Sequence, residues 1–365
     1  MRFFRLQYPL VLLLALLQLP VQSLAGGPDI GATAYRGYMW AHRKNMLAME
    51  APTMGFDLQF SWMTQEKDWN WAKAYRSPRV GVNLSYLDLG TDIAGKAFGV
   101  LPFVELKLMD RPQDEFNFRL SSGVGYLTQK WGFDNLKNKA IGSHFNANMR
   151  VHLVYHHVFK NKMELSALAG ITHFSNANFR MPNLGVNSVE LGIGLKRLKA
   201  GKPQQIGHFT PDPDARARRH EIKLSGATKE TGLVYSKRIY VGIIGYRYHI
   251  YCRTKSSVYG GIDYFYDQGF AYGDNPQDVK EKPNLKTSSE VALTLAHDLL
   301  LGKWAIVTEG GLYAYAAEWN KGPVFQRVGF KYHFTPNWLA SLTLKTHFAR
   351  ADYIEWGLAY TILEP

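Results

Sequence analysis

The sequence predicts an all-β fold, an antiparallel β-barrel that spans an outer membrane, and three observations support this prediction. First, apolar residues alternate with small or polar residues over many segments, such as residues 83–87 and 165–169. Second, these segments are roughly ten residues long and are separated by turn residues, as in outer-membrane barrels. Third, aromatic residues make up 14% of the chain, and aromatic residues border the strands of such barrels. A soluble β-sandwich or a periplasmic barrel is the alternative fold.

The N-terminal segment, residues 1–25, is expected to be a signal peptide. Arg2 and Arg5 supply positive charge before an apolar core at residues 10–19, and Ala25 ends a small-x-small cleavage pattern. This core is too short to span a bilayer, which needs about 20 apolar residues. Cys252 is the single cysteine of the chain, so we expect neither a disulfide framework nor an N-terminal lipid anchor.

Periodicity predicts eight strands in each half of the remaining chain. The N-terminal half, residues 26–200, and the C-terminal half, residues 220–365, are separated by a polar, proline-containing linker or long turn at residues 201–219. The expected strands are 33–41, 53–64, 78–88, 97–109, 115–129, 145–158, 163–175, 187–199, 220–227, 237–253, 256–268, 287–299, 302–316, 323–335, 338–348 and 353–363.

Sixteen strands fit either one enlarged barrel or two eight-stranded barrels. Thr172-His173-Phe174 recurs as Thr346-His347-Phe348, which is compatible with an ancient duplication. We favour a single barrel slightly, because the C-terminal half carries no functional motif of its own.

The seventh and eighth strands place polar residues on an apolar face. Side chains alternate between the two faces of a strand, and the apolar residues of strand 163–175 share a face with His173 and Ser175. Asn187 lies on the apolar face of the next strand, whereas Glu190 lies on the small and charged face, which should point into the lumen. Polar groups on a lipid face are usually functional, although they can also sit inert at the height of the lipid headgroups.

Residues 173–187, HFSNANFRMPNLGVN, resemble the active-site stretch of the lipid A 3-O-deacylase family, the outer-membrane acyloxyacyl hydrolases. The segments 78–81 (PRVG), 86–90 (YLDLG) and 140–144 (AIGSH) support this resemblance, which covers roughly residues 33–199. It implies a barrel whose outward-facing serine hydrolase site removes the ester-linked acyl chain at position 3 of lipid A.

The resemblance also implies roles for individual residues. Ser175 would be the nucleophile and His173 the general base, while Asn176 would donate to the oxyanion. The family has a glutamate where this chain has Asn187. The amide oxygen of Asn187 can accept from His173 but cannot stabilise its imidazolium with a charge. We therefore expect a slower hydrolase; the alternative is an inactive barrel that acts as a porin-like channel or a structural protein.

Topology places this candidate site beside the outer leaflet. With both termini periplasmic, the loop after each odd-numbered strand is extracellular, so the partner would be lipopolysaccharide or another outer-leaflet lipid. The net charge of +13 suits an anionic membrane surface, whereas a nucleic-acid partner is not expected. Neither a metal nor a cofactor motif is present, and we expect none. Cations in these loops could bind lipid A phosphates: Arg43, Lys44, Lys130, Lys137, Lys139 and Arg180.

The C-terminal half is expected to lack this site. His347, which corresponds to His173, shares a strand face with Ser341, Thr343 and Lys345. This face is polar, so we expect His347 to point into the lumen.

Overall fold

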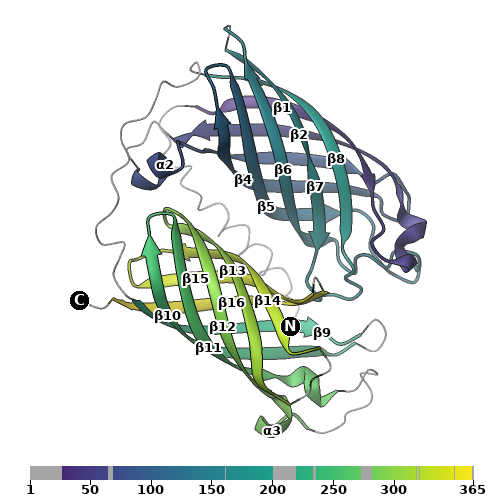
Figure 1. Ribbon diagram of the computed structural model, residues 1–365. Coiled ribbons are helices and arrows are strands. Elements are labelled where there is room, and N and C mark those ends of the chain that lie inside the picture. Colours follow the sequence, from purple (N-terminus) through teal and green to yellow (C-terminus); the bar gives the residue numbers. More distant parts are fainter. Residues whose placement is uncertain are drawn as a thin grey trace. The chain divides into compact units, whose positions relative to one another are not determined.

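The computed structural model describes residues 27–64, 69–160, 162–199, 219–232, 236–272, 282–317, 319, 321–348 and 350–363. The predicted signal peptide and residues 201–218 of the predicted linker lie outside the described residues. The chain forms two compact units, which hold two closed antiparallel barrels of eight strands each (Figure 1). The all-β barrel prediction is confirmed.

The preference for a single barrel is wrong. β8 (Val186–Arg197) pairs with β1 (Asp29–Met39), and β16 (Arg350–Leu363) pairs with β9 (Arg219–Glu230). In each half of the chain, the first and last strands therefore hydrogen-bond to each other. This closure leaves no edge strand with unpaired backbone groups.

The other strands of the first barrel agree with the predicted ranges to within a few residues. They are β2 (Ala51–Met63), β3 (Arg79–Asp88), β4 (Lys96–Asp110), β5 (Asp114–Leu127), β6 (Phe145–Val158) and β7 (Met163–Ser175). Two short helices were not predicted, the 3-10 helix η3 (Lys44–Met49) after β1 and α2 (Asn70–Ala74) after β2. They lie at opposite ends of the first barrel (Figure 1).

The predicted strands of the C-terminal half are present as well. They are β10 (Arg238–Arg253), β11 (Ser256–Asp267), β12 (Ser289–Leu301), β13 (Trp304–Ala316), β14 (Val324–His333) and β15 (Trp338–His347). The 3-10 helix η6 (Gln268–Ala271) and the single-turn helix α3 (Leu285–Ser288) lie between β11 and β12.

Burial alternates along the strands as the sequence predicts. In β8, Leu191 and Ile193 are 66% and 68% exposed, whereas Ser188 and Glu190 are each 1% exposed. The outer wall of the first barrel is therefore apolar and its lumen is polar. Within the described residues, no helix has both the length and the apolar character needed to cross a membrane.

Buried ion pairs and hydrogen bonds fill the lumen of the first barrel, some between neighbouring strands and some across it. Glu105 accepts from Arg119 Nε at 2.7 Å and from Asn117 Nδ2 at 2.8 Å, and it lies 2.7 Å from His156 Nε2. Arg79 donates to both carboxylate oxygens of Glu164, at 2.9 and 2.7 Å. Side chains that bridge opposite walls fill the interior of a barrel of this size.

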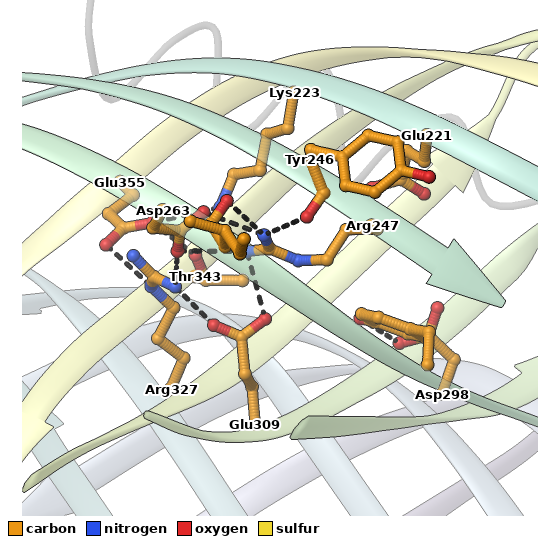
Figure 2. Close-up of polar contacts among 12 residues, drawn as sticks. Glu221, Lys223, Tyr246, Arg247, Asp263, Asp298, Glu309, Arg327, Thr343 and Glu355 are labelled. Atoms are coloured by element: carbon orange, nitrogen blue, oxygen red, sulfur yellow. Dashed lines mark hydrogen bonds and ion pairs between the residues drawn. The ribbon is translucent and has the colours of Figure 1, made fainter. Parts of the chain in front are cut away.

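The second barrel has its own network, shown in Figure 2. Arg247 Nη1 donates to Asp263 Oδ1 at 2.7 Å, and Arg327 Nε donates to Glu355 Oε1 at 2.8 Å. Glu309 joins both guanidinium groups. These carboxylates and guanidinium groups are almost fully buried, so the ion pairs fill part of the interior of the second barrel.

Candidate active site

His173 and Asn187 face each other across β7 and β8. They are direct cross-strand partners, and His173 Nδ1 lies 2.6 Å from Asn187 Oδ1. Because an amide oxygen only accepts, His173 donates through Nδ1, and its Nε2 carries the lone pair. Glu190 points the other way, into the lumen, where it accepts from Thr172 Oγ1 at 2.9 Å. The predicted faces of these residues are confirmed.

Ser175 lies two residues beyond His173 at the end of β7. Strand alternation puts it on the same outward side, but it is only 7% exposed, less than the prediction of a lipid-facing serine suggests. Its Oγ donates to Asn183 Oδ1 at 3.2 Å. The same oxygen accepts from the backbone N–H of Asn176 at 2.8 Å. The β7–β8 connection therefore folds over Ser175.

Asn183 is a site residue to which sequence reasoning assigned no role. It lies inside the motif that carries the family resemblance, after Pro182, but a turn composition of Pro, Asn and Gly gives it an ordinary structural explanation. Its position over Ser175 arises from a bridge to Ile141, a residue of the β5–β6 connection.

Asn176 is held by the same connection. Its side-chain amide donates to Ser143 Oγ at 2.7 Å, and Ser143 Oγ donates to Asn146 Oδ1 at 2.8 Å. Ser143 belongs to segment 140–144, so two of the sequence segments that carry the resemblance meet at this point.

Gly185 sets the path of the chain into β8. Its φ of +82° lies in the left-handed region, and a Cβ atom there would come 2.6 Å from His173 Cε1. Its N–H donates to the carbonyl oxygen of Ala140 at 2.9 Å. A glycine is therefore required both for the backbone conformation and for the close approach to the imidazole.

A hydrophobic cluster supports this end of the first barrel. It includes Phe174, between His173 and Ser175 in the sequence, which is 1% exposed. Its packing anchors the end of β7 while the neighbouring polar side chains point outward. The other buried members are Met39, Met46, Met49, Leu87, Leu89, Ala94, Ala97, Leu127, Ala140, Ile141 and Val186.

His42, in the β1–β2 connection, is a second unpredicted neighbour of the site. Asn187 Nδ2 lies 2.9 Å from His42 Nδ1; because an amide nitrogen only donates, this ring nitrogen accepts. Burial and the Arg43 charge lower the pKa of His42 from its usual value, which favours the neutral ring that this bond needs. His42 and Asn187 are 145 positions apart, and no local motif connects them.

The predicted cations lie in the connections at this end of the first barrel. Arg43 and Lys44 are exposed beside His42, and Lys137 is exposed in the β5–β6 connection. Lys130 and Lys139 are half-buried in that connection, and Arg180 is exposed in the β7–β8 connection. In the part of the chain that the structure describes, no group of three or more His, Cys, Asp or Glu side chains is placed to hold a metal ion.

Comparisons with known proteins find two family models that match successive parts of the chain. The model described as lipid A 3-O-deacylase (PagL) matches residues 53–196. The model described as acyloxyacyl hydrolase, C-terminal domain, matches residues 218–364. No curated protein sequence matches the chain.

Two solved structures are among those that match the chain. The outer membrane enzyme PagL is 18% identical; the match covers 45% of this chain and 97% of that one, with a TM-score of 0.32. A triple mutant of the Rhodopseudomonas blastica porin is 8% identical; the match covers 92% of this chain and 100% of that one, with a TM-score of 0.19.

Proposed function

The chain belongs to the PagL-type lipid A 3-O-deacylase family, and on this premise we propose that it is an outer-membrane ester hydrolase. Its substrate would be lipid A or a similar lipid of the outer leaflet, from which it would remove an ester-linked acyl chain. The observation that carries this proposal is the bond between His173 Nδ1 and Asn187 Oδ1, which gives the imidazole a basic Nε2 on the same side of the barrel as Ser175.

In the proposed reaction, Ser175 Oγ attacks the ester carbonyl carbon while His173 Nε2 takes the hydroxyl proton. Asn176 and nearby backbone N–H groups stabilise the oxyanion of the tetrahedral intermediate. His173 then returns the proton to the departing alkoxide, and the acyl group stays on Ser175. Water activated by His173 attacks this acyl-enzyme, which releases the fatty acid and restores the Ser175 hydroxyl.

The hydroxyl of Ser175 must turn for this reaction, because in the structure it donates to Asn183. A rotation about one side-chain bond is enough to change its acceptor, and catalytic hydrogen bonds are often poorly aligned before substrate binds. Asn183 would hold the hydroxyl in the resting site and release it when the ester enters.

We further propose that lipid A phosphates bind the cations around the site, which include Arg43, Lys44, Lys137, Lys139 and Arg180. Arg43 and Lys44 are exposed next to His42, which contacts the site residue Asn187. Charge-assisted bonds from these side chains would fix the diphosphorylated headgroup while the acyl ester reaches Ser175.

The packing of the lumens favours this enzymatic function over the porin-like alternative. Buried pairs such as Arg150–Asp57 in the first barrel and Arg327–Asp263 in the second join strands that are not neighbours and so cross the interior. Small barrels are filled in this way, whereas aqueous channels occur in barrels of about 16 strands.

The decisive experiment compares lipid A from cells that express the wild type, Ser175→Ala or Ser256→Ala. Ser256 is the control because it is a serine of the second barrel whose Oγ lies 2.6 Å from a histidine nitrogen, His297 Nε2. Mass spectrometry should show lipid A lacking one acyl chain with the wild type and with Ser256→Ala, and intact lipid A with Ser175→Ala. Identical lipid A profiles for the wild type and Ser175→Ala would overturn the proposed function.

A further inference from the structure

We propose that His42 is a positioning residue that holds the Asn187 amide in the one orientation that makes His173 a base. This inference rests on the proposed function and deepens it, because it explains how the site can work with an amide where its family has a carboxylate.

The reaction needs a particular tautomer of His173. The lone pair must lie on Nε2 to take the Ser175 proton, so the ring hydrogen must lie on Nδ1, where it needs an acceptor. Asn187 Oδ1 is that acceptor, at 2.6 Å. If a donor faced Nδ1 instead, the hydrogen would move to Nε2 and the base would be lost.

A carboxylate and an amide differ in how they meet this need. Both oxygens of a carboxylate accept, so either one serves. An amide presents an acceptor at one end and a donor at the other, so a half-turn of the Asn187 side chain replaces Oδ1 with Nδ2. An asparagine at this position therefore functions only if a second contact distinguishes its two ends.

His42 supplies that contact. Asn187 Nδ2 donates to His42 Nδ1 at 2.9 Å, so the reversed amide would place its oxygen against the His42 lone pair. Burial and the Arg43 charge lower the pKa of His42 more than its interaction with the backbone of Leu184 raises it. The neutral ring, which alone can accept from Asn187, is therefore favoured.

The segment that carries His42 is itself tied to the site. The backbone N–H of Trp40 donates to the carbonyl oxygen of Asn187 at 3.0 Å, which continues the β1–β8 pairing past the end of β1. The N–H of Ala41 donates to Glu50 Oε1 at 3.0 Å. His42 is therefore placed by the same two strands that place Asn187.

A double-mutant cycle tests the proposal with four proteins: the wild type, His42→Ala, Asn187→Glu and the double variant. Deacylation of purified lipid A in mixed micelles gives kcat and KM for each. We expect His42→Ala to lower kcat about tenfold to a hundredfold with little change in KM, less than the ~10⁴-fold cost of a fully wrong tautomer. In the Asn187→Glu background the same change should alter kcat no more than about twofold, the usual limit of additivity.

A purely structural role for His42 would give the opposite pattern. His42→Ala would then lower kcat by the same factor in both backgrounds, which would overturn the proposal, as would no loss in either. His42→Gln, whose side-chain oxygen can accept from Asn187, should recover part of the lost kcat. Heat-modifiable electrophoretic mobility confirms that each variant forms a folded barrel.

A second measurement does not depend on activity. The ¹⁵N chemical shifts of the His173 ring, assigned by their loss in His173→Gln, report which nitrogen carries the hydrogen. The wild type should show the Nδ1–H tautomer, and His42→Ala should show a mixture; an unchanged tautomer would overturn the role of His42. If the wild type were inactive, the proposed function would fail while this measurement still decided the role of His42.

Discussion

The amide of Asn187 gives the His173 imidazole orientation but no negative charge. In the proposed reaction the ring becomes an imidazolium when it takes the Ser175 proton, and an amide dipole stabilises that charge less than a carboxylate does. A carboxylate usually performs two tasks at this position, since it fixes the tautomer of the histidine and stabilises the imidazolium. In the proposed site Asn187 performs only the first of them.

The substitution Asn187→Glu should keep or raise deacylase activity. At an effective dielectric constant near 20, an ion pair at about 4 Å is worth up to roughly 4 kcal/mol, and burying the carboxylate offsets part of this. An increase in kcat of about tenfold corresponds to ~1.4 kcal/mol and is the expected result, measured with purified lipid A. Asn187→Leu, which has no acceptor, is the matched control and should lose activity.

A different outcome for this variant would be equally informative. If Asn187→Glu abolished activity while the barrel still folded, Asn187 would not be the group that orients His173. The charge of His42 also matters, since only the neutral ring accepts from Asn187.

The β7–β8 connection is the element that brings together the residues of the proposed site at this end of the first barrel. It passes over Ser175, contributes Asn183, and reaches β8 through Gly185, whose φ is +82°. The bridge from Asn183 to Ile141 and the bond from Gly185 N–H to Ala140 attach it to the β5–β6 connection. Two connections that are distant in sequence therefore form this part of the candidate site.

Replacement of Gly185 by alanine should damage the site without unfolding the barrel. The new Cβ would meet His173 Cε1 at 2.6 Å, and a non-glycine residue in the left-handed region costs roughly 1–2 kcal/mol. We expect kcat to fall at least about tenfold, with unchanged heat-modifiable mobility. Gly310→Ala is the control, because a Cβ there meets nothing within 4 Å; equal activity of both variants would show that the position of the imidazole tolerates this shift.

Strands and their faces could be predicted from the sequence, but the connections could not. Alternation of apolar and polar residues places His173 and Asn187 outward and Glu190 inward, because a strand has only two faces. His42 and Asn183 reach the site through loop paths that depend on contacts far along the chain. The number of barrels could not be predicted from the alternation of residues either. Alternation assigns each residue to the lumen or the outer wall, and that assignment is the same for one barrel as for two barrels closed by β1–β8 and β9–β16.

At the scale of the whole molecule, each barrel contains buried ion pairs whose two partners belong to that same barrel. Arg79 pairs with Glu164 in the first barrel, while Lys331 pairs with Asp298 in the second. Removing one partner of a buried ion pair lowers the free energy of unfolding by about 3–5 kcal/mol. We expect this loss to affect only the barrel that contains the pair. A change in the second barrel should therefore leave the chemistry of the first barrel intact.

The pair of variants His173→Ala and His347→Ala tests this division directly. His347 repeats the Thr-His-Phe sequence of His173, but it lies in the second barrel, 8% exposed, where its Nε2 is 3.1 Å from the hydroxyl of Tyr313. It points into the lumen of the second barrel, as the sequence predicts, and its ring lies against Tyr313 and Phe325. Loss of this hydrogen bond should cost the second barrel roughly 1–3 kcal/mol and leave the deacylation rate within about twofold of the wild type. His173→Ala should lower the rate by about 10³-fold or more. Rates measured on purified, folded proteins decide the matter, and a complete loss in His347→Ala would place the active site in the second barrel.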